Sequence, residues 1–77
     1  MVRGIDTRVA AALLGKGEQF VRIGLQQRRL PFGSAVQTGV GRWSYHISAK
    51  LLSDYTGIPQ QDIEAAQEEA DNAKRAG

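Results

Sequence analysis

The spacing of hydrophobic residues changes near residue 31, from a helical period to a period of two. Before this point, apolar residues recur three and four positions apart, and after it they alternate with polar ones until about residue 47. Spacings of three and four are typical of a helix with one packed side, whereas alternation is typical of a half-buried strand. Helical spacing then resumes. The pattern predicts two helices, a β-hairpin and two further helices.

The first predicted helix spans residues 8–14, and either Asp6 or Thr7 is expected to cap it. A side-chain oxygen at either position accepts a hydrogen bond from the free N–H groups of the first helical turn. Residues 15–17 contain two glycines and are expected to end this helix in a tight turn. The run is almost uniformly apolar, so it defines no sharp stripe. The residues expected on its buried side are Ala10, Ala11 and Leu14, with Leu13 beside them.

The second predicted helix, from Glu18 to about Gln27, separates its two sides more clearly. At about 100° per residue, its apolar side collects Phe20, Val21, Gly24 and Leu25. Its polar side collects Glu18, Gln19, Arg22, Gln26 and Arg29, with Ile23 at the border. Gly24 costs about 1 kcal/mol relative to alanine in a helix, and we expect it to permit close approach of the first helix. Pro31 ends the helix, because the residue before a proline is pushed out of the helical region.

Two alternating runs, residues 32–37 and 43–47, predict the strands of a β-hairpin. The segment between them, Thr38-Gly39-Val40-Gly41, has the glycine content typical of a hairpin tip. We expect Trp43 and Tyr45 to face the core from the second strand. The tip, residues 37–42, is then expected to face outward.

Two more helices are predicted in the last third of the chain. Ser48 is expected to cap the third, over residues 49–55, and Gly57 to end it. Its apolar members are Leu51, Leu52 and Tyr55. Pro59 opens the fourth, over residues 60–74, at a position where proline is well tolerated. This last helix has a mostly alanine stripe, which is expected to pack weakly: Ile63, Ala66, Ala70 and Ala73.

Size and composition argue against an enzyme. A chain of 77 residues has room for one domain, and a domain this small buries only about 60% of its unfolded surface. There is no cysteine and a single histidine, His46. The glycine-containing segments match neither a dinucleotide-binding fingerprint nor a phosphate-binding loop, and the acidic residues lack the spacing of a calcium loop. We therefore expect no catalytic residue, no cofactor and no metal.

Charge is distributed unevenly along the chain. Residues 1–50 carry eight Lys and Arg against two Asp and Glu, a formal charge of +6, and residues 51–77 carry two against six, a charge of −4. Such polarity indicates that the first two thirds face a polyanion. No apolar run of 18 residues and no leader segment is visible, so we expect a cytoplasmic protein with no membrane partner.

Two short helices joined by a tight turn, the second with a basic exposed side, are typical of a helix–turn–helix that binds DNA. Glutamine and arginine suit bidentate contacts with adenine and guanine, so Gln19, Arg22 and Gln26 are expected to read bases. Lys16, Arg28, Arg29 and Arg42 are expected to contact phosphates, which positions a protein without reading sequence. The hairpin is interpreted as a wing.

Residues 5–57 resemble the winged helix–turn–helix of MerR-type regulators and of excisionases from phages and conjugative transposons. The resemblance is carried by VAAALLGKGEQFVRIGLQQRRLPFG, by GRWSYHIS and by AKLLSDYTG. It implies the same base contacts from Gln19, Arg22 and Gln26 and backbone contacts from Lys16, Arg28 and Arg29. It also implies wing contacts from Gln37, Thr38 and Arg42. Thr7 departs from the pattern, which usually has an aliphatic residue there.

The predicted fold is α+β and mostly α: a winged helix–turn–helix over residues 1–58, with a two-stranded wing, followed by a C-terminal helix or tail over residues 59–77. The predicted function is sequence-specific binding of double-stranded DNA in a phage or mobile element. The protein would act as an excisionase-like architectural factor, with a site-specific recombinase as partner and self-association on DNA, or as a small transcriptional regulator. The alternative is a protein-interaction or structural module that uses the acidic fourth helix.

Overall fold

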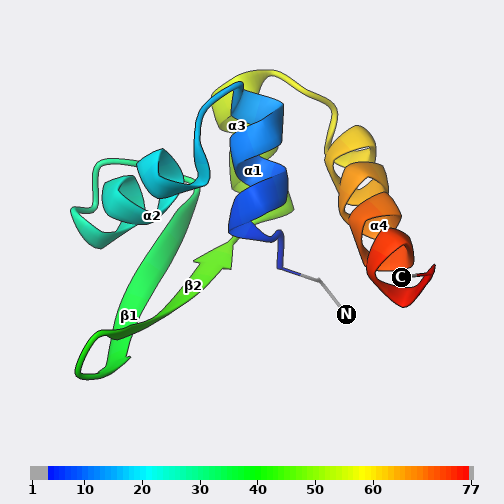
Figure 1. Ribbon diagram of the computed structural model, residues 1–77. Coiled ribbons are helices and arrows are strands. Elements are labelled where there is room, and N and C mark those ends of the chain that lie inside the picture. The colour runs from blue at the N-terminus through cyan, green and yellow to red at the C-terminus, as the bar shows by residue number, and fades with distance from the viewer. Residues whose placement is uncertain (1–3, 77) are drawn as a thin grey trace.

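The computed structural model describes residues 4–76, which form an α+β fold with more helix than strand (Figure 1). Its elements, in chain order, are α1 (Thr7–Leu14), α2 (Glu18–Gln26), β1 (Gly33–Gly39), β2 (Arg42–Ile47), α3 (Ala49–Thr56) and α4 (Gln60–Ala76). The four helices and the hairpin thus lie where the hydrophobic pattern predicts them. The tip of the hairpin is shorter than expected, because strand pairing continues to Gly39 and Arg42.

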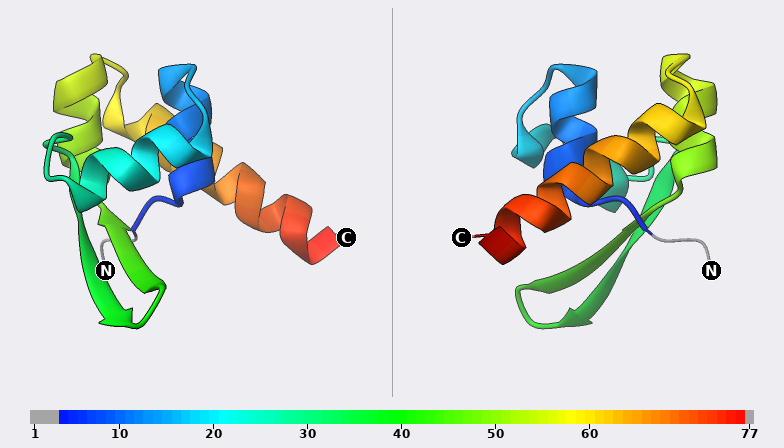
Figure 2. Two further views of the ribbon diagram at one scale, coloured as in Figure 1. Left: turned by 60° about the vertical axis from the view of Figure 1, so that its left-hand side comes forward. Right: turned by 90° about the vertical axis from the view of Figure 1, so that its right-hand side faces the viewer.

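The two central helices, α1 and α3, separate α2 and the hairpin on one side from α4 on the other (Figures 1 and 2). α2 contacts α1 and β1, whereas α4 contacts α3 and α1. The antiparallel register pairs Gly33 with Ile47 and Ala35 with Tyr45. Directly paired residues share a face of the sheet, so these four define the face that turns toward the core. The segment before α1 joins the hairpin where the Ile5 N–H donates to the Ile47 carbonyl, at 3.0 Å.

One apolar core receives side chains from all four helices and from the base of the hairpin, where Phe32 precedes β1 and Ile47 ends β2. Its buried members are Ile5, Val9, Ala10, Ala11, Val21, Leu25, Leu30, Phe32, Ile47, Ala49, Leu52 and Ile63. In α1, Val9 is buried and the predicted Leu14 is only half-buried. Of the three apolar members of α3, Leu52 is buried, whereas Leu51 and Tyr55 are exposed. The Tyr55 ring instead packs edge-on against Phe32, with ring centroids 5.3 Å apart.

Gly24 makes room for a side chain of its own chain segment rather than for α1. A Cβ atom at this position would lie 2.5 Å from Leu30 Cδ1 and 2.6 Å from Leu30 Cγ. Leu30 is buried, so it folds back over α2 immediately after the helix ends. The expectation that Gly24 admits the first helix was wrong, because helical periodicity alone does not show where the following loop goes.

α4 belongs to the same core as the other elements. Ile63 is fully buried, and Ala66 and Ala70 pack against the core, as the predicted stripe requires, whereas Ala73 is exposed. The alanine stripe is therefore anchored by one large side chain at its first turn. No helix within residues 4–76 is long and apolar enough to cross a membrane.

A buried glutamine ties α4 to the start of α1. Gln67 Oε1 accepts a hydrogen bond from the Asp6 N–H at 2.7 Å, and Gln67 Nε2 donates to Asp6 Oδ2 at 3.2 Å. Asp6 is the residue that precedes α1, but its side chain makes no capping hydrogen bond, and Thr7 already lies within the helix. The predicted side-chain cap is therefore absent, because the Asp6 carboxylate is turned toward α4.

Candidate nucleic-acid interface

α2 buries one narrow side and leaves the rest of its circumference to the hairpin and to solvent. Val21 and Leu25 are buried against the core. Phe20 was expected beside them, but it is 47% exposed. The ammonium of Lys16 lies 5.7 Å from the centroid of its ring. A cation above an aromatic face is attracted by the ring quadrupole, so the Phe20 ring holds the ammonium of Lys16 beside the first turn of α2.

The Arg22 side chain points toward the N-terminal end of α2 and toward the hairpin. Its Nη2 atom lies 2.7 Å from Glu18 Oε2, one helical turn earlier. Its guanidinium carbon also lies 6.0 Å from the centroid of the Tyr45 ring in β2. About half of the side chain remains exposed. Arg22 is thus available to an anion, but two neighbours already determine its direction.

Gln26 is bonded to the hairpin. Its Nε2 atom donates to the Tyr45 hydroxyl at 2.6 Å, and both side chains are half-buried. The sequence placed Gln26 on the outward side of α2 without a structural role, and this was wrong. The hydrogen bond joins the end of α2 to the middle of β2, so the orientation of the hairpin relative to α2 is fixed by a specific polar contact.

Glu18 joins the beginning of α2 to α1. Its carboxylate accepts a hydrogen bond from Thr7 Oγ1 at 3.1 Å and lies 3.7 Å from the Arg8 guanidinium. The carboxylate is also in the first turn of α2, where negative charge is favoured by the helix dipole. Thr7 therefore supplies a polar contact between the two helices where an aliphatic side chain would supply none.

Gln19 and Ile23 of α2 and Gln27, the residue that directly follows the helix, are all exposed on the side opposite the buried Val21 and Leu25. The three exposed residues are four positions apart, and the middle one, Ile23, is 41% exposed. Of these three, only Gln19 is predicted from the sequence to read bases. The sequence predicts Gln27 only as the end of the helix and Ile23 only at the border of its polar side.

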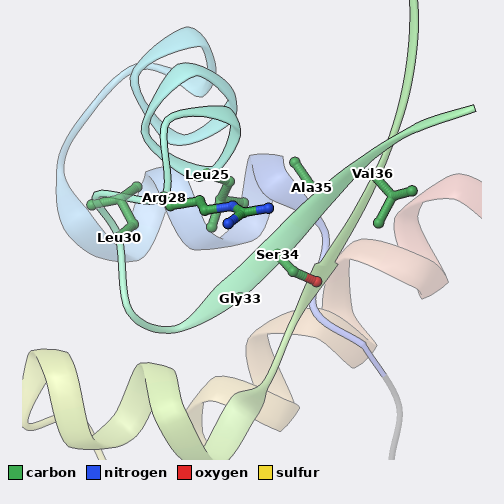
Figure 3. Close-up of a pocket in the computed structure, with 7 residues that line it drawn as sticks. All are labelled: Leu25, Arg28, Leu30, Gly33, Ser34, Ala35 and Val36. Atoms are coloured by element: carbon green, nitrogen blue, oxygen red, sulfur yellow. The ribbon is translucent and has the colours of Figure 1, made fainter.

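α2 ends in a turn that presents two arginines. Arg28 has a φ of 58°, in the left-handed region. The Arg28 N–H donates to the Leu25 carbonyl at 3.1 Å, and the Arg29 N–H donates to the Gly24 carbonyl at 2.8 Å. These bonds give two carbonyl groups in the last turn of α2 a hydrogen-bond partner. The Arg28 side chain then extends across Leu25 toward β1, at the mouth of a pocket of about 420 Å³ (Figure 3). Both arginines are exposed, so an anion can reach their guanidinium groups.

The tip of the hairpin is fully open to solvent. Gln37, Thr38 and Arg42 are all exposed, and Gln37 Nε2 donates to the Gly39 carbonyl at 3.3 Å. Val40, at the turn, has its whole side chain exposed. The three predicted wing residues therefore lie together at the distal end of the hairpin, as the outward-facing tip requires.

Trp43 does not lie in the core, contrary to the sequence-based prediction. It is 37% exposed and, with Arg22, Gly41 and Tyr45, lines a groove of about 230 Å³ between α2 and the hairpin. Trp43 shares the inward face of β2 with Tyr45 and Ile47, but it is paired with Gln37 near the tip, beyond the reach of the core. Alternation predicted its face correctly and could not predict how far the core extends along the strand.

Five of the basic residues and five of the acidic residues lie on different groups of elements. Lys16, Arg22, Arg28, Arg29 and Arg42 belong to α2, to the turns on either side of it and to the hairpin. Asp62, Glu64, Glu68, Glu69 and Asp71 belong to α4. These two groups of elements are separated by α1 and α3 (Figure 1). The uneven distribution of charge along the sequence thus corresponds to a separation in space between these basic residues and the acidic residues of α4.

Within residues 4–76, no three His, Cys, Asp or Glu side chains are placed so that they could hold a metal ion together. Comparisons with protein-family models, with curated proteins and with solved structures gave no match to this chain. The candidate interface is therefore defined by its own geometry: an exposed helix, two basic turns and an aromatic groove beside a polar hairpin tip.

Proposed function

We propose that this chain is a small winged helix–turn–helix protein that binds specific double-stranded DNA. In this proposal α2 enters the major groove, which is wide enough for an α-helix. The hairpin, acting as a wing, lies along the adjacent backbone or minor groove. By the resemblance of its sequence to excisionases and MerR-type regulators, the protein serves a phage or mobile element, either in excision with a recombinase or as a regulator of transcription.

The observation that carries the proposal is the concentration of exposed positive charge around α2 and the hairpin. DNA presents one negative charge per 1.7 Å of its axis, and contacts with its phosphates supply most of the non-specific affinity. Lys16, Arg28 and Arg29 lie at the two ends of α2, where such contacts orient a helix in a groove. The acidic α4 lies on the far side, where it does not oppose the approach of DNA.

A second function, interaction with another protein through α4, has one observation in its favour. A shallow groove of about 330 Å³ runs between α1 and α4, and its lining is mostly apolar. The residues that line it are Arg8, Val9, Ala12, Leu13, Ala66, Glu69 and Ala70. This groove is on the opposite side from the basic elements, so a partner bound there and DNA bound by α2 would not compete.

A matched pair of charge deletions tests the DNA proposal. Arg29→Ala removes a cation beside α2, and Lys74→Ala removes one from α4, on the other side of the molecule. We expect Arg29→Ala to weaken binding to any duplex about fivefold, because the loss of one hydrogen bond costs about 1 kcal/mol of binding free energy. Lys74→Ala should leave the affinity unchanged. Fluorescence anisotropy with a labelled duplex measures both. Equal affinities for the two variants would contradict the proposal.

A further inference from the structure

The direction of each α2 side chain determines which chemical groups it can offer to a DNA groove. Arg22 and Gln26 are turned toward Glu18 and Tyr45, and both leave the outermost line of the helix. That line is occupied by Gln19 and Ile23 and continues into Gln27, the residue that follows α2. We call these three residues the Gln-Ile-Gln stripe. We infer that the Gln-Ile-Gln stripe reads A·T base pairs in the major groove, with Ile23 against a thymine methyl group. This inference rests on the proposed function.

The spacing of the stripe fits several adjacent base pairs. Residues 19 and 27 are eight positions apart, which corresponds to about 12 Å along a helix axis. Successive base pairs are about 3.4 Å apart, so the stripe spans three to four of them. Ile23, at the centre of the stripe, is 41% exposed although its side chain is branched and apolar. An aliphatic side chain has no hydrogen-bond donor or acceptor. The only group on a base edge that it can contact favourably is therefore an apolar one.

The chemistry of the base edges selects adenine and thymine. A glutamine amide accepts from adenine N6–H₂ and donates to adenine N7, and thymine presents a C5-methyl group to apolar side chains. Guanine presents two acceptors, which favour arginine or lysine. The one arginine within α2, Arg22, is already paired with Glu18 at 2.7 Å. The stripe consequently offers the partners of A·T pairs and lacks the preferred partner of guanine.

Selection from a random duplex library by the intact protein tests this inference first. Bound duplexes are recovered and sequenced, and we expect A·T pairs at adjacent positions of the enriched site. Enrichment of G·C pairs, or binding without any enrichment, overturns the inference and leaves DNA binding intact. Failure to bind any duplex at low salt overturns both the inference and the proposed function.

Removal of the thymine methyl group tests the role of Ile23 directly. Replacing the thymines of the recovered site by deoxyuridine changes nothing but these methyl groups. We expect the wild-type protein to bind the deoxyuridine duplex about fourfold more weakly, the factor that corresponds to one buried methyl-sized group. This measurement requires no variant, so it holds even if a substitution disturbs the fold. Equal affinity for the two duplexes contradicts the inference.

Two variants then assign the effect to a residue. Ile23→Ala is expected to bind both duplexes equally, because the apolar partner of the methyl group is gone. Leu51→Ala is the matched control, since Leu51 is 46% exposed on α3, and it should retain the fourfold difference. If Ile23→Ala weakens binding to both duplexes and keeps the difference between them, Ile23 does not contact the methyl group. Thermal unfolding confirms that each variant is folded.

Discussion

Arg28 ends α2 in a backbone conformation that glycine adopts at lower cost. α1 and α3 each end at a glycine with positive φ, Gly15 at 70° and Gly57 at 80°, whereas α2 ends with Arg28 at 58°. A residue with a Cβ atom pays about 1–2 kcal/mol for this conformation. Strain of this kind is often found at functional sites. A charged residue kept in a strained position beside the candidate interface fits a role in binding better than a role in stability.

Replacement of this residue separates stability from binding. Arg28→Gly is expected to raise the free energy of unfolding by about 0.5 kcal/mol, because the relief of strain exceeds the entropic cost of glycine. The same change should weaken duplex binding about fivefold through the loss of one phosphate contact. Chemical denaturation measures the first effect and fluorescence anisotropy the second.

Arg29→Gly provides the control for Arg28. It removes the same charge one residue later, at a position without positive φ. It should weaken binding similarly and lower the stability instead of raising it. A loss of stability in Arg28→Gly equal to that in Arg29→Gly would show that the left-handed turn stores no strain.

At the scale of elements, α2 and the hairpin are joined by polar contacts rather than by packing alone. The Tyr45 ring lies beside the Arg22 guanidinium and its hydroxyl accepts from Gln26. Both contacts come from residues on the side of α2 that faces β2. They hold the helix and the hairpin in one relative orientation, which would lower the entropic cost of placing both on DNA in the proposed complex.

Removal of the Tyr45 hydroxyl tests this coupling. Tyr45→Phe keeps the ring but leaves the Gln26 amide without its acceptor, so we expect a loss of about 1 kcal/mol in the free energy of unfolding. Duplex binding should weaken as well, because the wing is less firmly oriented. Tyr55→Phe is the control, because Tyr55 is exposed and its structural contact is made by the ring. Equal thermal stabilities of the two variants would argue against the coupling.

The elements themselves were predictable from local patterns, and their mutual contacts were not. Helix ends at Gly15 and Gly57 and the cap at Ser48 depend on neighbouring residues in the chain, and the structure confirms them. The contact between Gln26 and Tyr45 depends instead on the register of the hairpin relative to α2, which no local spacing encodes. The same limit explains why Trp43 was placed in the core.

The link between Asp6 and Gln67 shows the same limit at longer range. The two residues are 61 positions apart, and Gln67 lies on a helix whose predicted stripe contained only apolar residues. A buried glutamine requires hydrogen-bond partners, but the sequence does not show which residue supplies them. A cap at Asp6 was predicted from local preference, and a tertiary contact displaced it.

At the scale of the whole molecule, the separation of charge sets how the protein would meet DNA. The basic elements lie together on one side and α4 carries most of the acidic residues on the other. The net charge of +2 is too small to show this, and only the order of charges along the chain predicted it. Such a dipolar distribution steers a polyanion toward the basic side.

The salt dependence of duplex binding tests the central claim most directly. Four side chains, Lys16, Arg28, Arg29 and Arg42, are proposed to contact phosphates. The logarithm of the association constant should therefore fall with the logarithm of salt concentration with a slope of about −3.6, or −0.9 for each contact. The intact protein, titrated against a labelled duplex at several salt concentrations, gives this slope. A slope near zero, or no binding even at low salt, would contradict the claim that this protein binds DNA.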